Sequence, residues 1–509
     1  MSEGQQIEDR KTKLNKLREL GVDPYGRRFE KVMALAEVRG QGEALGLEPG
    51  QHAEQATVRA AGRVMLHRPC GKLVFMTIRD GSGDVQVGVS KAAVSVEQFT
   101  IANKLLNLGD VIGVDGTLGR TKTGELTVWA RSLTVLCKAI EPPPEKWHGL
   151  RDIDLRYRRR YVDLFTNPEV RETFKQRSLI IEAIRRCLVE RGFLEVETPV
   201  LQPIYGGAAA RPFTTHHNTL DMKLFLRISP ELYLKRLLVG GIERVFEFAR
   251  CFRNEGISPR HNPEFTMLEL YEAYGDYHDM MELMEATVSA AIERIGGGYR
   301  RRYGELELDF APPWPRRSYA ELLQEHAGVN MRDVAAVRAK AAALGIEHGK
   351  LDDAIVISEV FEATVEPQLV QPQFVLDYPA PLCPLTRRKP DDPGIALRFE
   401  AFVAGCELGN AYTELNDPQV QEDNFRRTLA GENREETMAV LDEDFVLALR
   451  YGMPPAGGLG IGVDRLVMLL TNSTSIRDVI LFPLQRPLGS ADPQDPPAGD
   501  GESVISRHT

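Results

Sequence analysis

Long apolar runs are absent from this sequence of 509 residues. None approaches the roughly 18 consecutive apolar residues that a membrane-spanning helix needs. The composition, 43% apolar and 27% charged, is typical of a soluble globular protein. The opening stretch MSEGQQIEDRKTKLNK also lacks the apolar core of a secretory signal peptide. We therefore expect a cytoplasmic protein that does not bind a membrane.

Closely spaced cysteines are also missing. The six cysteines lie far apart and form no CxxC pair: Cys70, Cys137, Cys187, Cys251, Cys383 and Cys406. This spacing favours free thiols in a reducing compartment over disulfides or a zinc site. We assign them no chemistry.

An overall positive charge, which would favour a nucleic-acid partner, is lacking as well, because the net charge is −10. The charge is unevenly distributed, however. Residues 1–150 carry 21 Lys and Arg against 18 Asp and Glu, a net charge of +3, so the rest of the chain carries −13. Five of the nine residues from Arg10 to Arg18 are basic. This cluster is compatible with a helix that contacts phosphates, and also with a solvated helix face.

Internal repeats are not found, and the patterning instead divides the chain into domains. Residues 1–56 are expected to form a helical region. Residues 57–141 contain five short β segments, with one helix between the third and the fourth, which fits a small antiparallel barrel of the OB type. The prolines of EPPPEKW cannot continue a helix or a central strand, so residues 142–150 are interpreted as a stiff linker.

The second domain is expected to cover residues 151–486. It opens with a helix whose apolar residues recur at helical spacing and which Gly192 should end. Helical patterns dominate roughly residues 316–366, which we interpret as an insertion between blocks of strands. The tail, residues 487–509, is rich in proline, glycine and acidic residues and is expected to be disordered.

One group of charged residues lies among apolar ones in FEFARCFRNEGISPRHNPEFTMLELYEAY, residues 246–274. Because residues two apart on a strand share a face, Arg253 and Glu255 are expected on one face before the loop, and Glu269 and Tyr271 on one face after it. A guanidinium in such a hairpin suits a phosphate, which it can bind with two parallel hydrogen bonds. The alternative is a surface ion pair between Arg253 and Glu255.

A second hairpin is predicted in ALRFEAFVAGCELGNAYTELND. With a turn near Ala404 and Gly405, Glu400 and Glu407 become diagonal neighbours on adjoining strands, close enough to share a hard cation such as Mg²⁺. The residues that follow, two apart on one strand face, are Asn410, Tyr412 and Glu414. The alternative is an edge strand with its polar residues toward water.

Glycines dominate a third stretch, GGLGIGVDRLVMLL, which places Arg465 near the start of an apolar helical run. Glycines let the backbone approach a ligand closely, and Arg465 could meet an anion there. The stretch lacks the strand, turn, helix and later acidic residue of a dinucleotide-binding motif. Tight packing of a helix on a sheet is an equal alternative.

Taken in order, three stretches resemble the signature motifs of the class II aminoacyl-tRNA synthetases. These are FLEVETPVL as motif 1, FRNEGISPRHNPEFTMLELY as motif 2 and GLGIGVDRLVMLL as motif 3. The segments GGAAARPFTTHHNTLDMKLFLRISPELYLKRLLVGG and ELGNAYTELNDP are similar to those of the bacterial lysine-specific members of that family. The similarity covers nearly the whole chain, apart from the acidic tail and parts of the insertion.

The resemblance implies a fold and an activity. The fold is α+β: a catalytic domain with an antiparallel sheet flanked by helices, preceded by an all-β OB-fold domain that binds the anticodon. The activity is activation of L-lysine by ATP, with release of pyrophosphate, and transfer of lysine to the 3′ end of tRNA(Lys) in protein synthesis. A homodimer built around motif 1 and more than one Mg²⁺ ion per subunit are implied as well.

The same resemblance implies the site residues. The ATP-binding residues are Arg253, Glu255, His261, Asn262, Phe265, Glu400, Glu407, Gly462 and Arg465, of which Arg253 and Arg465 are catalytic and Glu400 and Glu407 bind the metal. Arg253 holds the α-phosphate, Phe265 stacks on adenine, and Arg465 covers the other side of adenine and reaches the γ-phosphate. The lysine-binding residues are Gly207, Glu231, Glu269, Tyr271, Asn410, Tyr412 and Glu414. In the barrel, Phe75 and Gln86 read the central anticodon uridine by stacking and by hydrogen bonds.

The mixture of charges also has a physical explanation that does not depend on the resemblance. A carboxylate that reacts with ATP brings several negative groups together, so cations are needed around the phosphates, while a cationic amino acid needs carboxylates at the far end. No protein nucleophile is required, because the substrate carboxylate can attack the α-phosphorus directly. An acidic pocket would repel aspartate, and buried glutamates are costly without an ammonium to meet them.

Some residues depart from the family pattern. Cys406 stands where the family usually has arginine, and Ala249 and Cys251 lie in ARCFRNEG where NRNFRNEG is common. Neither change removes a residue with an implied role, although both bear on turnover. Tyr412 replaces the usual phenylalanine and keeps an aromatic wall.

Two other functions are compatible with parts of this pattern. A tRNA-binding regulatory paralogue without catalysis would be favoured by the loss of Arg253, Glu407 or Arg465, and all three are present. A lysine ligase that modifies a protein would resemble short relatives that lack the front barrel, and the predicted barrel argues against it.

Overall fold

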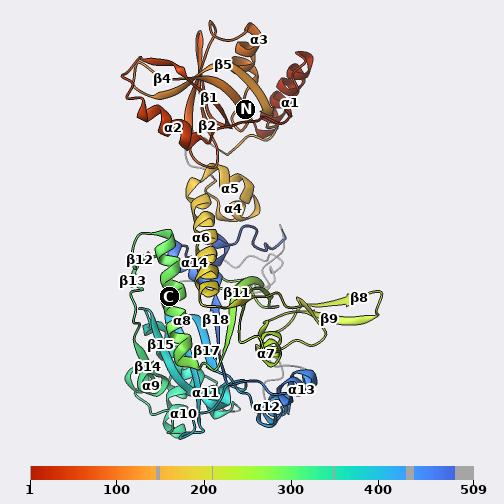
Figure 1. The fold of residues 1–509 in the computed structure, drawn as a ribbon, viewed down its shortest axis with the longest axis vertical. Helices are drawn as coiled ribbons and strands as arrows, with labels where there is room; N and C mark the ends of the chain where they lie inside the picture. The colour runs from red at the N-terminus through yellow and green to blue at the C-terminus, as the bar shows by residue number, and fades with distance from the viewer. Residues whose placement is uncertain are drawn as a thin grey trace, which may run out of the picture. The chain divides into compact units, whose positions relative to one another are not determined.

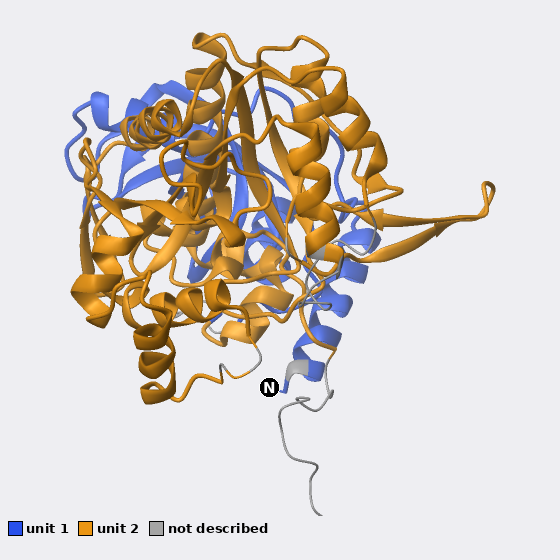
Figure 2. Cartoon of the chain, turned by 90° about the horizontal axis from the view of Figure 1, so that it is seen from below, with its two compact units in different colours: residues 1–150 blue, residues 151–509 orange. Residues whose placement is uncertain are grey.

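The computed structural model describes residues 2–144, 150–208, 210–347, 349, 351–430 and 441–487. The chain divides into two compact units, residues 1–150 and residues 151–509, which Figure 2 shows in separate colours. Most of the predicted tail and part of the predicted linker, residues 488–509 and 145–149, lie outside the described residues. Among the helices that the structure describes, none is long and apolar enough to cross a membrane.

The first unit is built around a closed five-stranded barrel with the strand order β1-β2-β3-β5-β4. Its elements are α1 (Glu3–Glu19), α2 (Leu35–Ala44), β1 (His52–Cys70), β2 (Leu73–Arg79), β3 (Asp84–Ser90), α3 (Val96–Thr100), η1 (Ile101–Leu105), β4 (Val111–Arg120) and β5 (Leu126–Cys137). Alternate residues of β2, Val74, Met76 and Ile78, are fully buried in the barrel, as the two-residue period of a strand requires. The expected OB-type barrel, with its helix between the third and fourth strands, is confirmed.

The basic helix α1 does not present all its cations to solvent. Arg10 is 5% exposed, and its guanidinium donates to the carbonyl oxygens of Leu108, Ala139 and Glu141. Arg10 therefore fastens the helix to the barrel. Lys16 and Arg18 are exposed and remain available to a polyanion.

A buried ion pair lies where β4 begins and β5 ends. Lys138 and Asp110 are both fully buried, and the Lys138 ammonium lies 2.9 Å from the Asp110 carboxylate and 2.8 Å from the Asn107 side-chain oxygen. The Asp110 carboxylate also accepts a hydrogen bond from the backbone N–H of Ala139. Removing one partner of such a pair leaves an uncompensated buried charge.

We expect Lys138→Met to lower the free energy of unfolding of the barrel by about 3–5 kcal/mol. Hydrogen exchange of the barrel amides, measured by mass spectrometry on the full chain, gives this energy locally. The control is Arg131→Met on β5, whose ion pair with Glu54 is exposed, so that its loss is expected to cost less than about 1 kcal/mol. Equal effects of the two substitutions would contradict this interpretation.

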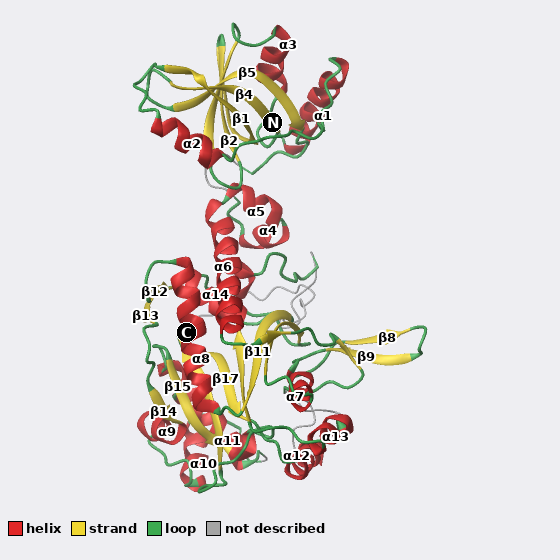
Figure 3. Cartoon of the chain, in the orientation of Figure 1, coloured by secondary structure: helices red, strands yellow, loops and turns green. Residues whose placement is uncertain are grey.

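The second unit has an eight-stranded sheet with the order β14-β15-β16-β17-β18-β11-β10-β6. Its strands are β6 (Leu194–Glu195), β10 (Arg244–Phe252), β11 (Glu264–Ala273), β14 (Arg316–Ser318), β15 (Gln373–Pro379), β16 (Ile395–Val403), β17 (Cys406–Thr413) and β18 (Ala456–Gly462). All neighbouring strands pair antiparallel except the short edge strands β6 and β14, which pair parallel. The predicted antiparallel sheet flanked by helices is thus confirmed (Figure 3).

Helices cover both faces of this sheet (Figure 1). They are α4 (Ile153–Arg158), α5 (Arg160–Thr166), α6 (Pro168–Glu190), α7 (Glu231–Val239), α8 (Tyr277–Ile295), α9 (Tyr319–Ala327), α10 (Val334–Ala343), α11 (Asp353–Thr364), η2 (Glu366–Gln368), η3 (Ala380–Leu382), α12 (Pro418–Ala430), α13 (Glu443–Arg450), α14 (Val463–Thr471) and α15 (Ile476–Val479). Helices α6, α8 and α14 share one apolar core with the strands, whereas α7 and α13 pack on the other face. Gly192, with φ +81°, follows the end of α6 as expected.

Smaller sheets complete the unit. Strands β7 (Leu201–Gln202), β8 (Thr214–His217) and β9 (Met222–Leu226) form one, and β12 (Arg300–Tyr303) and β13 (Leu306–Asp309) form another. The β8–β9 hairpin extends away from the rest of the unit (Figure 1). The segment 316–366, predicted as helical, contains α9, α10 and α11 but begins with the strand β14.

The two-residue period of the strands sorts their side chains between the core and the opposite face. On β11, Leu268 and Leu270 are buried in the core with α6 and α8, whereas Glu269 and Tyr271 point to the other side. On β18, Leu459 and Ile461 lie in the same core, and the intervening positions are glycines. The candidate site occupies this second face.

Candidate functional site

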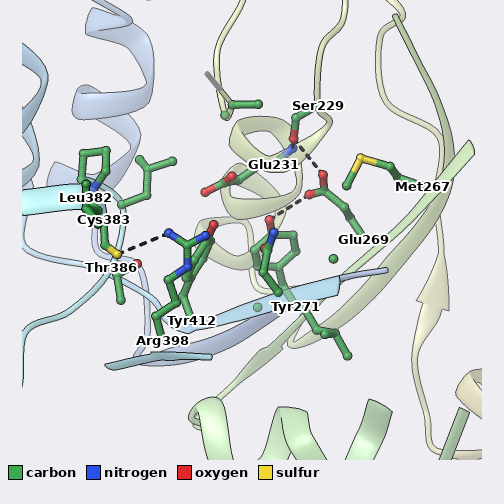
Figure 4. A pocket seen from close by; sticks show the side chains of 18 of the residues that line it. Ser229, Glu231, Met267, Glu269, Tyr271, Leu382, Cys383, Thr386, Arg398 and Tyr412 are labelled. Carbon is green, nitrogen blue, oxygen red and sulfur yellow. Dashed lines mark hydrogen bonds between the residues drawn. The ribbon is translucent and has the colours of Figure 1, made fainter. Parts of the chain in front are cut away.

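A cavity of about 320 Å³ lies on the face of the sheet away from α6 and α8 (Figure 4). Strands β11, β17 and β18 form its floor, and helix α7 contributes to one wall. Eight of the predicted lysine-site and ATP-site residues line it together: Gly207, Glu231, Arg253, Glu269, Tyr271, Glu407, Asn410 and Tyr412. Residues from motifs far apart in the sequence thus meet at one surface.

One end of this cavity is acidic. Glu269 is 5% exposed and accepts hydrogen bonds from the hydroxyls of Ser229, at 2.8 Å, and Tyr271, at 3.0 Å. Burial, with the nearby charge of Glu231, raises the pKa of Glu269 to about 7. Figure 4 shows Ser229 and Tyr271 directed at this carboxylate. An ammonium group placed here would relieve the cost of ionising Glu269.

The other two predicted glutamates share a cation that belongs to the chain. Lys235, fully buried one turn after Glu231 on α7, lies 2.6 Å from the Glu231 carboxylate and also contacts the Glu414 carboxylate. Glu414 is 1% exposed and, unlike the other predicted lysine-site residues, is not part of the cavity lining. Burial lowers the pKa of Lys235, but the charges of Glu231 and Glu414 raise it more, so the amine stays protonated.

Two glycines are required by the packing of these carboxylates. Gly207 has φ +86°, and a Cβ there would lie 3.0 Å from the Glu231 side chain. At Gly458 on β18, a Cβ would lie 2.0 Å from a Glu414 oxygen and 2.5 Å from the Tyr271 ring. The glycine-rich strand therefore leaves room for the acidic side chains above it.

A second cavity of about 160 Å³ adjoins the first, and Arg253, Glu407 and Asn410 line both. It brings together eight of the predicted ATP-site residues: Arg253, Glu255, His261, Asn262, Phe265, Glu407, Gly462 and Arg465. Within the described residues, the Arg253 Nε and the Asn262 Oδ1 are buried and have no hydrogen-bond partner. Unpaired buried polar atoms beside a cavity indicate groups that a ligand can satisfy.

The two catalytic candidates hold different positions in this cavity. The Arg253 guanidinium lies 5.1 Å from the Phe265 ring centroid. Arg465 donates to the backbone carbonyl of Glu407 at 2.6 Å and lies 3.4 Å from the His261 Nε2. Burial and the charge of Arg465 lower the pKa of His261, so its imidazole is neutral near pH 7.

The predicted strand alternation of Arg253 and Glu255 is wrong. Strand β10 ends at Phe252, and the backbone N–H of Glu255 bonds to the carbonyl of Arg253 in a tight turn. Glu255 is exposed at the rim of the second cavity. No ion pair joins Arg253 to Glu255 in the part of the chain that the structure describes, which removes the surface-pair alternative.

A buried polar contact connects helix α6 with the second and third sequence motifs. The Asp464 carboxylate accepts from Arg177 on α6 at 2.6 Å and from the backbone N–H of Thr266 on β11 at 2.7 Å. Asp464 lies at the start of α14, beside Arg465. The contact therefore fixes Arg465 relative to the strand that carries Glu269.

The second predicted hairpin forms as expected, with a small change of register. Ala404 and Gly405 have positive φ values and make the turn between β16 and β17. An irregularity between Ala401 and Phe402 sets Glu400 opposite Asn410, while Glu407 pairs with Phe402. The Asn410 amide donates to the Glu407 carboxylate at 2.7 Å.

The chemistry of Glu400 and Glu407 fits a hard cation. Burial and the charge of Glu407 raise the pKa of Glu400, against the effect of Arg398. Burial raises the pKa of Glu407, but Arg465 and Asn410 lower it more. Mg²⁺ usually takes one or two carboxylates together with substrate phosphates, and no cluster of three or more metal-binding side chains occurs within the described ranges. Glu407 lines both cavities, whereas Glu400 lines neither and contacts Arg398 and the Tyr378 hydroxyl.

Arg398 on β16 was not anticipated from the sequence. Its guanidinium pairs with Glu400 and lies between the rings of Tyr378 and Tyr412, 4.9 Å and 5.3 Å from their centroids. Figure 4 shows it on the opposite side of the cavity from Glu269. The strand pattern could have placed Arg398 on the face of Glu400, two residues away, but nothing in the sequence showed that it would be buried.

The barrel carries the predicted anticodon residues on neighbouring strands. Phe75 on β2 lies edge-on to Trp129 on β5, with ring centroids 5.9 Å apart. Gln86 on β3 donates to the Thr127 hydroxyl at 2.8 Å. Trp129 itself was not predicted: a Cβ at Gly88 or at Gly119 would lie within about 3 Å of its indole, so both glycines make room for that ring.

The departures from the family pattern have simple surroundings. Ala249 and Cys251 are fully buried on β10, and burial raises the pKa of the Cys251 thiol to about 12. The Cys406 sulfur lies 3.7 Å from the carbonyl oxygen of Glu407. Cys406 also lines a small cavity next to Arg260 and Arg465.

Known families and proteins match both units. The family profile described as tRNA synthetases class II (D, K and N) matches residues 152–486, and the profile described as OB-fold nucleic acid binding domain matches residues 58–136. A lysine–tRNA ligase of Pelotomaculum thermopropionicum is 51% identical over 485 residues, covering 94% of each chain. Similar proteins from Carboxydothermus hydrogenoformans and Moorella thermoacetica, also named lysine–tRNA ligases, are 49% and 50% identical. They cover 94% and 93% of this chain, and 98% and 96% of their own length.

Proposed function

The chain belongs to the class II tRNA synthetases of the aspartate, lysine and asparagine group, and from this membership we propose its reaction. It activates L-lysine with ATP to lysyl-adenylate and pyrophosphate, and then transfers lysine to the 3′ end of tRNA(Lys). The observation that carries the proposal is the cavity that is acidic at one end and borders Arg253 at the other. This arrangement complements an amino acid with a positive side chain and a negative carboxylate.

Lysine is proposed to bind with its side-chain ammonium toward Glu231 and Glu269. Both carboxylates line the cavity, and Tyr271 holds Glu269 in place. Gly207, Asn410 and Tyr412 line the remaining walls, and the buried Glu414 acts from outside the cavity lining. Aspartate would bring a second carboxylate into this acidic end and be repelled.

ATP is proposed to bind in the adjoining cavity. Phe265 stacks on one side of adenine and Arg465 covers the other side. The walls of the cavity are completed by Glu255, His261, Asn262 and Gly462. Glu400 and Glu407 would hold Mg²⁺, in more than one ion per subunit, and the metal would neutralise charge on the triphosphate. Arg253 lies between the two cavities and can contact the α-phosphate there.

The chain's own residues align and neutralise the reactants. An oxygen of the lysine carboxylate attacks the α-phosphorus, and the bond to pyrophosphate breaks, with Arg253 stabilising the charge that develops at phosphorus. A hydroxyl of the terminal tRNA ribose then attacks the lysyl carbonyl, and AMP leaves. Within the described residues, no side chain needs to act as a nucleophile.

The proposal extends to partners and location. Residues 57–141 bind the anticodon of tRNA(Lys), with Phe75 stacking on the central uridine, Gln86 reading it, and Trp129 extending the aromatic surface. The chain acts as a homodimer built around motif 1, in the cytoplasm. Light scattering on the purified protein measures its oligomeric state, and a monomer at the concentration used for the activity assays would contradict the homodimer.

Charging of tRNA tests the proposed function directly. We expect the protein to attach radiolabelled lysine to a tRNA(Lys) transcript, and to leave transcripts of the aspartate and asparagine tRNAs uncharged. Lysine-dependent exchange of pyrophosphate into ATP without charging of any tRNA would point to a different acceptor. Absence of both activities would contradict the proposal.

The raised pKa of Glu269 predicts a pH dependence of lysine binding. In the empty site this pKa is about 7, and a bound ammonium lowers it, so affinity is complete above pH 7 and is lost as the pH falls through 7. The kcat/KM for lysine in pyrophosphate exchange, with saturating ATP, should fall up to about tenfold per pH unit below 7. The Glu269→Gln variant should lose this inflection. A flat profile between pH 6 and 8 in the unaltered protein would contradict the assignment.

The barrel residues should affect tRNA without affecting activation. Phe75→Ala is expected to raise the KM for tRNA(Lys) by about 10- to 100-fold, because loss of a stacked base costs about 1–3 kcal/mol. Pyrophosphate exchange, which needs no tRNA, serves as the internal control and should be unchanged. A loss of exchange equal to the loss of charging would show that the two units do not divide the work in this way.

A further inference from the structure

Lys235 is a buried cation in the wall of the cavity proposed for lysine. It lies on α7, four residues after Glu231, and is fully buried. Its ammonium is 2.6 Å from the Glu231 carboxylate, contacts the Glu414 carboxylate, and lies 5.9 Å from the Tyr271 ring centroid. The chain thus places a lysine side chain of its own against two of the glutamates expected to meet a substrate lysine.

The groups around this ammonium come from four elements. Glu231 faces it from α7, Glu269 and Tyr271 lie on β11, Glu414 directly follows β17, and the backbone of Gly458 on β18 lies beneath Glu414. Among these described residues, two carboxylates contact the ammonium, and the third, that of Glu269, is close enough to interact with both of them. When the three carboxylates and the Lys235 ammonium are all ionised, their net charge is −2. A lysine zwitterion brings two ammonium groups, which match this charge.

Lys235 pairs with both Glu231 and Glu414. Glu414 is pressed against the sheet, since one of its oxygens occupies the space that a Cβ at Gly458 would need. Besides Lys235, no described residue donates a hydrogen bond to the Glu414 carboxylate or pairs with it. The Glu231 side chain extends from α7 into the cavity (Figure 4), with one oxygen bonded to Lys235. Lys235 is therefore the one cation that contacts both carboxylates among the described residues.

We propose that Lys235 is a positioning residue that serves as the internal counter-ion of the amino-acid cavity. It holds Glu231 and Glu414 in place. It also reduces the charge of the three carboxylates from −3 to −2, which the two ammonium groups of one substrate lysine can neutralise. The inference rests on the proposed function, because it concerns the same cavity. Without Lys235, three buried carboxylates would repel one another, and some would take up protons instead of binding the substrate.

Four variants of the full-length protein test this role in lysine-dependent pyrophosphate exchange. Lys235→Met removes the ammonium and keeps the apolar stem, and Glu414→Gln removes one carboxylate charge and keeps its shape. The double variant restores the net charge of −2. Arg236→Met is the matched control: it removes a cation from the next position of α7, where Arg236 pairs with Asp442.

Lys235→Met is expected to raise the KM for lysine at least tenfold, with kcat and the KM for ATP within about threefold of the unaltered protein. The pH inflection of kcat/KM for lysine should move to higher pH. The double variant should have a lysine KM at least about threefold lower than that of Lys235→Met and should return the inflection toward 7. Arg236→Met should change none of these values.

Other outcomes would overturn the proposal. A KM for lysine and a pH profile that stay unchanged in folded Lys235→Met would make Lys235 a structural residue only. If the loss of lysine affinity in the double variant equals the sum of the losses in the two single variants, Glu414 binds the substrate directly and Lys235 does not balance its charge. If Lys235→Met does not fold, the double variant, which carries no unbalanced charge, is compared with Glu414→Gln. A lysine KM no higher than that of Glu414→Gln supports the proposal, and a KM at least tenfold higher overturns it. Absence of exchange in the unaltered protein would instead refute the proposed function.

Discussion

Arg253→Ala is expected to lower the rate of lysine-dependent pyrophosphate exchange by about 10³-fold or more. Arg253 lines both cavities, and its Nε is buried without a partner among the described residues, so it can meet the phosphate at which charge develops. An arginine that stabilises the charge of a phosphoryl-transfer transition state contributes about 10³- to 10⁵-fold in rate. Both kcat and kcat/KM should fall together, because the contact is strongest in the transition state.

Arg250→Ala provides the matched control for this variant. Arg250 lies three residues earlier, on β10, with an exposed side chain that pairs loosely with Glu264 at 3.4 Å. Its loss should leave exchange within about twofold, since exposed pairs contribute little. If the exchange rate of Arg253→Ala stays within tenfold of that of the unaltered protein, Arg253 does not contact the reacting phosphate.

Glu269→Gln is expected to raise the KM for lysine by at least about 30-fold. The substitution keeps the shape of the side chain but removes the charge that the Ser229 and Tyr271 hydroxyls orient. Truncating one partner of a desolvated charge pair costs about 2–5 kcal/mol, and about 1.4 kcal/mol corresponds to a tenfold change. The KM for ATP should change little, because Glu269 does not line the second cavity.

The control for Glu269→Gln lies on the same strand. Glu264 begins β11 and is exposed, so Glu264→Gln should leave the KM for lysine unchanged. Equal effects of the two substitutions would indicate a general loss of negative charge. An unchanged KM in Glu269→Gln would mean that the acidic end of the cavity does not bind the substrate ammonium.

The sequence predicted the sheet well where strand periodicity and turn chemistry acted together. Alternation placed Glu269 and Tyr271 on one face of β11, and the Ala404–Gly405 turn paired β16 with β17. Both predictions are local, since they need only a period of two and residues that can adopt positive φ.

The errors arose where the end of an element or its burial decided the outcome. Arg253 and Glu255 were expected on a strand face, but β10 ends one residue before Arg253. Arg10 was counted with the exposed basic residues of α1, yet it is bonded to barrel carbonyls that are about 100 or more residues away in the chain. Composition and spacing carry no information about such distant contacts.

Lys235 shows the same limit inside the site. The spacing of four residues from Glu231 predicts a helical ion pair, which is usually exposed and weak. Only the fold brings Glu414, 179 positions later, to the same ammonium and buries all three groups. The character of the cavity was thus predictable from its glutamates, but its internal cation was not.

Comparing lysine with norleucine in pyrophosphate exchange tests the central claim most directly. Norleucine has the same four-carbon side chain without the terminal ammonium, so it should fit the cavity yet leave Glu231 and Glu269 uncompensated. We expect kcat/KM for lysine to exceed that for norleucine by about 10⁴-fold, the discrimination found when buried polar groups lose their partner. Norleucine activated within about tenfold of lysine would contradict the claim that these carboxylates recognise the substrate ammonium.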